Sequence, residues 1–207
     1  IDRIRISSIE PNLLTNEIIE FCASSKKFMP HFHVPLQSGS DKILGAMRRR
    51  YKRDLFVNRV TRIKQTMKDA CIGVDVITGF PGETEKDFLD TYNFLNELDI
   101  SYLHVFTYSE RPNTDAIEMS EIVSKEIRRE RSKMLHILSD KKRRFFHDQF
   151  IGKYRPVLFE NMKNGKLLGH TDNYIQIQME GGSDLINSIH SVKLVDNHGI
   201  VVDGKLS

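Results

Sequence analysis

Hydrophobic and polar residues follow two different periods over the first hundred residues of the chain. Short apolar runs with a period of two predict four β-strands, at 4–8, 32–36, 72–77 and 101–108. Between them, apolar residues recur every three or four positions and predict helices, at about 14–22, 41–47, 56–67 and 84–98. This alternation predicts right-handed βαβ units and a parallel sheet. Because four strands are too few for a closed barrel, two architectures stay open: a small doubly wound sheet, or part of a (β/α) barrel whose beginning is missing.

The pattern changes near residue 120. Residues 124–153 contain ten Lys or Arg against four Asp or Glu at helical apolar spacing, which predicts one long basic amphipathic helix ending at Gly152. Beyond it, short alternating runs follow too closely for crossover helices, and Asn164-Gly165 predicts a β-hairpin. These runs, one of them at 174–178, predict a small antiparallel barrel of the OB type. We therefore expect an α/β part over 1–120, a linking helix over 121–152 and a barrel over 153–207.

Composition excludes several classes of protein. The 207 residues carry a net charge of +3, from 31 Lys and Arg against 28 Asp and Glu, which excludes an acidic tail protein and a histone-like polycation. No apolar run is long enough to predict a transmembrane helix. Cys22 and Cys71 form no CxxC pair, so they predict neither a disulfide scaffold nor a thiolate metal site, and we expect a cytoplasmic protein. Because the start carries no Met and no signal-peptide pattern, we expect it to be internal to a longer protein.

Polar, small and charged residues follow each predicted strand. The carboxyl ends of parallel strands meet at one edge of a sheet, so these residues predict one shared site, although turns are polar in any protein. They are Ser7, Ser8, Glu10, Gln37, Ser38, Ser40, Asp75, Thr78, Gly79, Tyr108, Ser109, Glu110 and Arg111.

The segment Gly79-Phe80-Pro81-Gly82-Glu83 and the residue Arg111 suggest what such a site binds. A glycine just past a strand takes positive φ readily and lets a planar ligand, such as a purine, approach the main chain. Glu83 is explained more simply as a favourable charge near a helix start. Arg111 either clamps a carboxylate or phosphate, or pairs with Glu110 or Glu118. The absence of a GxxxxGKS run leaves nucleoside triphosphate hydrolysis without support.

Histidines and clustered cations complete the candidates. His31 and His33 share one face of a strand, and without a third ligand they predict packing rather than a metal site. Two basic clusters lie next to aromatic residues and predict contact with a nucleic-acid backbone, the alternative being solvated helix faces. The clusters comprise Arg48, Arg49 and Arg50, and Lys141, Lys142, Arg143 and Arg144.

Three segments together resemble one enzyme family. HVPLQSGSDKIL at 33–44, DVITGFPGET at 75–84 and YSERPNT at 108–114 occur in the order and spacing of the methylthiotransferase branch of the radical S-adenosylmethionine (SAM) enzymes. The segments 47–51 and 103–112 look most like the subgroup that acts on N6-threonylcarbamoyladenosine in tRNA. The final barrel resembles the TRAM domain of these enzymes. Asn113 stands where glycine is usual, and asparagine also tolerates a left-handed conformation.

The resemblance implies a reaction and its cofactors. Such enzymes add a methylthio group to C2 of an adenine next to the anticodon, using S-adenosylmethionine and two [4Fe-4S] clusters. The family's cluster cysteines, CxxxCxxC on the first barrel strand, are not in this chain. We therefore expect four of about six strands of a partial parallel (β/α) barrel, followed by an OB-like TRAM barrel. We also expect the chain to be inactive alone. The implied partners are the tRNA anticodon stem-loop and S-adenosylmethionine, and the exposed sheet edge leaves the oligomeric state open.

The resemblance also implies roles for single residues. Gln37 and Ser38 would face the methionine or ribose, and Asp75, Thr78 and Gly79 would line the adenosine side. The main chain from Phe106 to Tyr108 would meet adenine, with Arg111 at the pocket mouth. Two other hypotheses remain: a non-catalytic RNA-binding module on an α/β scaffold, and a sugar-phosphate barrel enzyme. The latter lacks a strand-end lysine or paired carboxylates.

Overall fold

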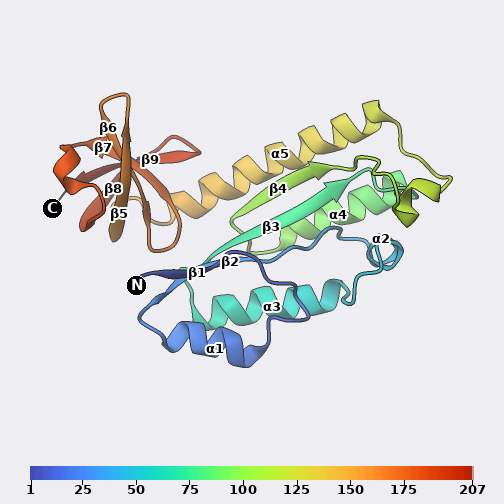
Figure 1. Ribbon diagram of the computed structural model, residues 1–207, viewed down its shortest axis with the longest axis horizontal. Coiled ribbons are helices and arrows are strands. Elements are labelled where there is room, and N and C mark those ends of the chain that lie inside the picture. The colour runs from blue at the N-terminus through green and yellow to red at the C-terminus, as the bar shows by residue number, and fades with distance from the viewer. Residues whose placement is uncertain (207) are drawn as a thin grey trace.

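A four-stranded parallel sheet forms the first half of the computed structural model, which describes residues 1–206 (Figure 1). The strand order is β1-β2-β3-β4, the order of the chain. A doubly wound sheet reverses its strand order at a switch point, and this sheet does not. The order is therefore that of a barrel wall. The strands are β1 (Ile4–Ile6), β2 (Phe28–His33), β3 (Cys71–Thr78) and β4 (Tyr102–Thr107).

Helices connect the strands and cover one face of the sheet. Right-handed crossovers that always advance in the same direction place their helices on the same side. The main core lies between them, where Phe56, Val74, Leu95 and Leu135 are fully buried. The opposite face carries the half-buried or exposed side chains of alternate strand positions, including Asp75. The helices are α1 (Asn16–Ser24), α2 (Asp41–Ala46), α3 (Arg53–Thr66), α4 (Glu85–Glu97) and α5 (Lys125–Asp148), with a 3-10 turn at Asp115–Glu118.

Local sequence explains where α1 and α4 begin. The Thr15 hydroxyl accepts a hydrogen bond from the Ile18 N–H at the start of α1. At α4, Thr84 and Asp87 form a capping box, as the run Thr84-Glu85-Lys86-Asp87 predicts. The Asp87 carboxylate also accepts from Ser40 at 2.9 Å and from Lys42 at 2.9 Å. These contacts hold the loop after β2 against the start of α4.

The second strand differs from its prediction. It covers Phe28–His33 rather than 32–36, because Pro30 obscures a strand pattern and the apolar residues of 34–36 extend it too far. Val34 and Leu36 are nevertheless buried, and their N–H groups bond to the carbonyls of Gly73 and Asp75. The chain thus stays beside β3 as far as Gln37, which bridges to Val76.

A closed five-stranded barrel forms the second part, in the order β5-β6-β7-β9-β8. Four of its strand pairs are antiparallel as predicted, but β7 and β9 pair in parallel, which corrects the all-antiparallel prediction. Asn164 and Gly165, at φ of 52° and 80°, form the two-residue hairpin turn. Tyr174 lies in a turn and not in the strand expected at 174–178. The strands are β5 (Tyr154–Lys163), β6 (Lys166–Thr171), β7 (Gln176–Glu180), β8 (Ile189–Asn197) and β9 (Val201–Leu206), with a 3-10 turn at Ser183–Leu185; position 207 of the predicted range lies outside the described residues.

Helix α5 joins the two parts. Leu135 and Leu138 belong to the core under the sheet, whereas Phe146 belongs to the second core with Phe159 and Ile177 of the barrel. Figure 1 shows the helix running alongside β4 from the carboxyl ends of the strands to the barrel. None of the helices described within 1–206 has the length and apolar character needed to cross a bilayer.

Candidate functional site

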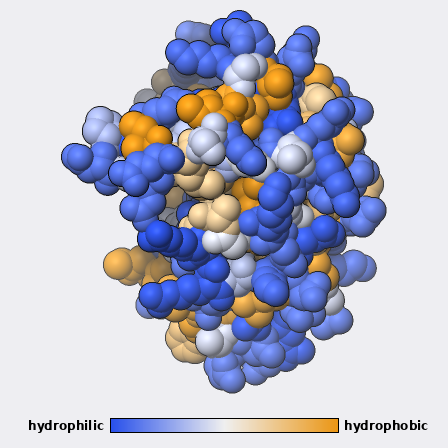
Figure 2. All heavy atoms as spheres, turned by 90° about the vertical axis from the view of Figure 1, so that its right-hand side faces the viewer, coloured by the Kyte–Doolittle hydropathy of each residue, from blue (hydrophilic) through white to orange (hydrophobic). Residues whose placement is uncertain are grey.

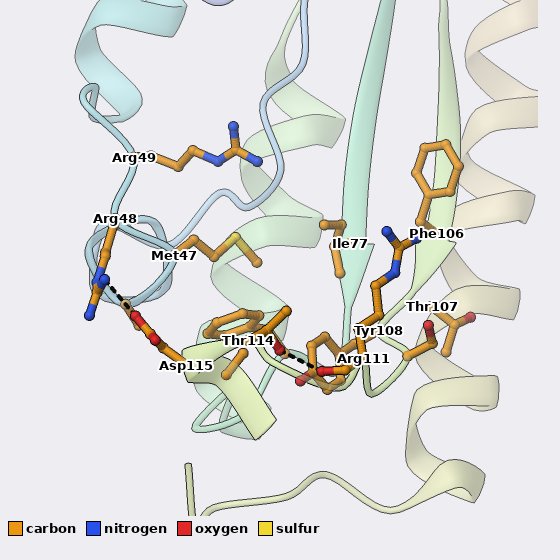
Figure 3. Close-up of a pocket in the computed structure, with 14 residues that line it drawn as sticks. Met47, Arg48, Arg49, Ile77, Phe106, Thr107, Tyr108, Arg111, Thr114 and Asp115 are labelled. Atoms are coloured by element: carbon orange, nitrogen blue, oxygen red, sulfur yellow. Dashed lines mark hydrogen bonds and ion pairs between the residues drawn. The ribbon is translucent and has the colours of Figure 1, made fainter. Parts of the chain in front are cut away.

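A cavity of about 580 Å³ opens at the carboxyl ends of β3 and β4 (Figure 3). Figure 2 looks onto this end of the molecule, where apolar groups are exposed within a mostly hydrophilic surface. The cavity is built from the α2–α3 loop, the ends of both strands and the segment after β4. Its lining residues are Ala46, Met47, Arg48, Arg49, Ile77, Phe80, Phe106, Thr107, Tyr108, Ser109, Arg111, Thr114, Asp115 and Ala116.

One wall of the cavity is apolar and aromatic. Ile77 and Phe106 lie opposite each other in the register of β3 and β4, so both side chains leave the same face of the sheet. Phe106, on the last strand of the sheet, remains 52% exposed and so offers apolar surface to the cavity. Phe80 and Tyr108 meet edge to face, with their centroids 5.5 Å apart. This wall can accept a flat, weakly polar ring system.

Arginines line the same cavity. Arg49 donates to the Glu10 carboxylate at 2.7 Å, and Arg48 pairs with Asp115. Arg111 forms no ion pair within residues 1–206, so the predicted partners Glu110 and Glu118 do not bind it. In Figure 3 the guanidinium groups of Arg49 and Arg111 point into the space between the loop and the strands. The cavity is therefore lined by Arg111, which has no ion-pair partner within residues 1–206, and by Arg48 and Arg49, which are both paired.

Glu110 and Glu83 each bind a different arginine of α5. Arg128 donates to the Glu110 carboxylate at 2.7 Å and to the Tyr108 carbonyl at 2.9 Å. Arg131 donates to the Glu83 carboxylate at 2.6 Å, in a pair that is almost completely buried. Burial raises the pKa of Glu83 despite this partner. Glu83 is thus a buried ion-pair partner, which corrects its simpler explanation as a charge at a helix start.

Gly79 is needed for the packing of α5. It has φ of 74°, its N–H donates to the Glu83 carboxylate at 2.8 Å, and an added Cβ would lie 2.3 Å from Cγ of Arg128. The missing side chain therefore makes room for Arg128, and the approach of a ligand to the main chain of Gly79 stays a prediction.

Five residues predicted to bind the cofactor do not line this cavity. Gln37 has φ of 73° and bridges to Val76 through its main chain. The Ser38 hydroxyl is fully buried, 3.3 Å from the hydroxyl of Thr91, so it faces α4 and not the open strand ends. The remaining three are Asp75 on the uncovered face of the sheet, Thr78 with a buried hydroxyl near the Phe106 carbonyl, and Gly79 as described above. Phe106, Tyr108 and Arg111 do line the cavity.

Asp75 belongs to a polar cluster on the uncovered face. Its carboxylate lies 2.6 Å from Nε2 of His33, whose Nδ1 lies 2.8 Å from the Ser7 carbonyl. The bond to Asp75 raises the pKa of His33, whereas burial lowers the pKa of His104. Each of the three side chains can place one ligand atom within 4.8 Å of the others, so they could hold a cation, and a proton on His33 explains the short contact equally well. Asp75 and His104 join this cluster because β3 pairs with β4 and places the two residues opposite each other. The spacing of His31 and His33 along the sequence could not indicate that neighbourhood.

The two basic clusters lie on different elements, the first in the α2–α3 loop and the second near the end of α5. Arg48 and Arg49 are paired as described, while Arg50 is exposed. In the second cluster, Lys141 and Arg144 are exposed. Lys142 differs from the expectation: its ammonium donates to the carbonyls of Asn96 and Leu98 at the end of α4. That ammonium is therefore not free for a phosphate. Arg143 is half-buried, with its guanidinium 5.8 Å from the ring centroid of Tyr102.

Comparisons with known proteins find relatives over most of the chain. The model of the radical SAM superfamily matches residues 1–95. The threonylcarbamoyladenosine tRNA methylthiotransferase MtaB of Bacillus subtilis is 38% identical over 200 residues, covering 94% of this chain and 44% of the relative. The tRNA-2-methylthio-N(6)-dimethylallyladenosine synthase of Wolinella succinogenes is 35% identical over 210 residues, covering 99% and 48%. The chain is thus similar to radical SAM methylthiotransferases over nearly its whole length.

A solved radical SAM enzyme resembles this chain at the level of the fold. Coproporphyrinogen III oxidase (HemN) of Escherichia coli superposes with a TM-score of 0.51 at 17% identity, covering 72% of this chain and 34% of the oxidase. The chain spans about half the length of the curated relatives named above.

The residues of this chain do not fit an iron–sulfur cluster. Its two cysteines are buried in different cores, Cys22 under the sheet and Cys71 next to the barrel. Burial raises the pKa of Cys71 to about 12, which disfavours the thiolate that a metal needs. No step of the reaction is therefore derived from a cluster held by this chain.

The sequence does not predict the ion pair of Glu10 and Arg49. In the sequence, Glu10 is one of many polar residues after a strand, and Arg49 is one residue of a basic cluster. Thirty-nine residues separate the two, and only the folded chain places their charged groups 2.7 Å apart. The turn signals and charges alone carry no information on such a pairing.

Proposed function

We propose that this chain is part of a tRNA methylthiotransferase that adds a methylthio group to C2 of N6-threonylcarbamoyladenosine next to the anticodon. It supplies part of the S-adenosylmethionine pocket and part of the tRNA surface, and it is inactive without the cysteines that hold the clusters. The observation that carries the proposal is the cavity at the ends of β3 and β4, which joins an exposed aromatic wall to a free arginine.

The cavity fits S-adenosylmethionine in size and chemistry. Its 580 Å³ lie within the usual range of small-molecule sites, about 300–1,000 Å³. Phe106 and Ile77 offer flat apolar contacts for adenine. An amino-acid head group carries one carboxylate and one ammonium, and the neighbouring Arg49 and Glu10 carry the complementary charges. Arg111 remains available at the mouth for a carboxylate or a phosphate.

The other predicted residues act on the ligand or on the shape of its site. Asp75, on the uncovered sheet face, is suited to accept hydrogen bonds from ribose hydroxyls, and Gln37 lies at the end of the adjoining segment. Ser38, Thr78 and Gly79 act through their internal bonds, which fix the strand ends. Bound next to a cluster, S-adenosylmethionine supplies the radical chemistry; the residues of this chain bind it, orient it and exclude water.

The tRNA surface of the proposal comprises a cation of the α2–α3 loop and the cations at the barrel end of α5. The barrel order, with its single parallel pair, supports an OB-type, TRAM-like domain over 153–207, next to the linking helix over 121–152 and the barrel wall over 1–120. The cations that would contact phosphates are Arg50, Lys141, Arg143 and Arg144. Arg48 and Arg49 are left out because they pair with Asp115 and Glu10, and Lys142 is left out because of its bonds to α4.

Two observations favour threonylcarbamoyladenosine over an isopentenyl-type base. The relative named for the former is 38% identical, against 35% for the dimethylallyladenosine synthase. The threonylcarbamoyl group also carries a carboxylate, which suits a cavity lined by Arg48 and Arg111.

The test uses the full-length protein in cells whose own gene is deleted. Arg111→Ala should lower the 2-methylthio form of threonylcarbamoyladenosine in tRNA at least tenfold, because the cavity loses the arginine that has no ion-pair partner within residues 1–206. The measurement is mass spectrometry of tRNA nucleosides, and Arg129→Ala, an exposed arginine of α5, is the control. Unchanged methylthiolation in the Arg111 variant contradicts the pocket assignment. Loss of a different nucleoside on deletion of the gene contradicts the substrate.

A further inference from the structure

An ion pair lies at one side of the cavity at the strand ends. Arg48, in the loop between α2 and α3, pairs at 2.5 Å with Asp115, the first residue of the 3-10 turn Asp115–Glu118. Both residues line the cavity, and Figure 3 shows their contact on the side opposite Phe106. The pair therefore joins, at the edge of the cavity, two segments that are distant in the sequence.

Arg48 stands at a position where a helix end usually has glycine. The N–H groups of Arg48 and Arg49 donate to the carbonyls of Gly45 and Leu44, both at 2.9 Å, which is the Schellman arrangement at the end of α2. The first residue beyond the cap then takes a left-handed conformation, and Arg48 has φ of 55°. A residue with a Cβ is strained there, and such strain is typical of functional positions. Because the helix end itself favours glycine, the side chain of Arg48 has to account for the arginine.

The pair of Arg48 and Asp115 contributes little to the fold. Their side chains are 80% and 76% exposed, and water competes for charges that are so exposed, so ion pairs of this kind are weak. No residue of the turn Asp115–Glu118 is buried, so moving the turn breaks no contact of the core. Another anion can therefore replace Asp115 on Arg48.

The neighbouring pair of Arg49 and Glu10 differs in this respect. Its side chains are only 28% and 39% exposed, so water competes with it less. Arg48 is thus the paired arginine of this cavity that can exchange its partner. A guanidinium binds a carboxylate through two parallel hydrogen bonds, so the natural replacement for the carboxylate of Asp115 is another carboxylate. Until it arrives, Asp115 competes with any phosphate that approaches Arg48.

We propose that Asp115 holds the place of a substrate carboxylate on Arg48. When the modified base enters the cavity, the carboxylate of its threonylcarbamoyl group replaces Asp115, and the turn Asp115–Glu118 moves aside. This exchange rests on the proposed function, which supplies the base and its carboxylate. It goes beyond that function by assigning a selecting residue, Arg48, and a residue that occupies the selector before the substrate binds.

Arg48→Gly in the full-length protein tests the selecting residue. Glycine removes the guanidinium and relieves the positive φ, so the midpoint of thermal unfolding should not fall. Fluorescence anisotropy measures the affinity for two labelled anticodon stem-loops, which differ only in carrying threonylcarbamoyladenosine or adenosine. The preference for the modified stem-loop, which is the ratio of the two affinities, should fall about tenfold with the loss of one charge-assisted contact. Lys52→Gln removes the same charge from the same loop and should leave the ratio unchanged.

Asp115→Asn tests the exchange. This variant removes the anion that competes with the substrate, so the ratio should rise about two- to fivefold, as expected from the weakness of an exposed ion pair. The gain requires a free Arg48, so Asp115→Asn should not change the ratio in a protein that already carries Arg48→Gly. Glu118→Gln, exposed on the same turn, is the matched control and should leave the ratio unchanged.

The outcomes separate this inference from the proposed function. If Arg48→Gly keeps the preference of the parent protein, or Asp115→Asn lowers it, the inference is overturned and the proposed function stands. An equal gain from Asp115→Asn with and without Arg48 overturns it as well, because the gain then comes from the overall charge. If the parent protein has no preference for the modified stem-loop, the substrate of the proposed function is wrong, and the inference fails with it.

Discussion

At the scale of single residues, polar side chains in this protein mostly satisfy one another. Ser38 and Ser40 look from the sequence like ligand-binding groups at a strand end, yet both hydroxyls are buried against Thr91 and Asp87 of α4. The sequence indicates that polar groups gather at this edge, because turn residues and strand periods can be read along the chain. The direction in which each side chain points depends on neighbours distant in sequence, such as Thr91.

The buried histidine His147 gives a pH-dependent prediction. Burial lowers its pKa from 6.5 to about 4, so the folded state favours the neutral ring. Its contribution to stability is present above pH 6.5 and is lost as the pH falls toward 4. Between pH 7 and pH 5 the free energy of unfolding should therefore fall by about 2 kcal/mol through this group.

His147→Gln should remove that part of the pH dependence, measured by urea unfolding at pH 7 and at pH 5. The same substitution at His136, which is exposed on the same helix, is the control. A variant that loses stability between the two pH values as steeply as the parent protein would contradict the prediction.

At the scale of elements, the sequence predicts which helices and strands exist better than it predicts where each begins and ends. The long helix, the capped start of α4 and the hairpin at Asn164-Gly165 follow from signals within a few residues of each other. The limits of β2 and the parallel pairing of β7 with β9 do not, because both depend on backbone hydrogen bonds to segments far along the chain. The contact of α5 with the strand ends is likewise invisible in the sequence, since Glu83 and Arg131 meet across 48 residues.

That ion pair supports a prediction on stability. Arg131→Ala leaves the Glu83 carboxylate buried and unpaired, which should lower the free energy of unfolding by about 3–5 kcal/mol. Chemical denaturation with circular dichroism measures the change. Arg129→Ala, on the exposed side of the same helix, should change it by less than about 0.5 kcal/mol. Equal stability of the two variants would show that the buried pair contributes nothing.

At the scale of the whole molecule, the positive charges are unevenly distributed over the surface. A net charge of +3 conceals exposed cations at the barrel end of α5, where Lys141 and Arg144 form no ion pairs within residues 1–206. If this end follows a phosphate backbone, the double variant Lys141→Glu with Arg144→Glu should bind RNA stem-loops more weakly. The slope of log affinity against log salt should fall by about one to two.

Lys26→Glu with Lys86→Glu makes the same change in net charge beside α1 and on α4, outside α5 and the barrel, and serves as the control. Filter binding at several salt concentrations measures both. If the control weakens binding as much as the double variant of α5, the attraction is a property of the overall charge and not of this surface.

One continuous helix also sets a distance. Arg128 of α5 donates to the carbonyl of Tyr108 at the cavity of the strand ends, and Arg143, fifteen residues later, lines a second, smaller cavity between the sheet and the barrel. At 1.5 Å per residue the two positions are about 22 Å apart along a rod with no break between them. The helix therefore fixes the spacing of the two cavities, and inserting one helical turn would move the barrel about 5.4 Å further from the strand ends.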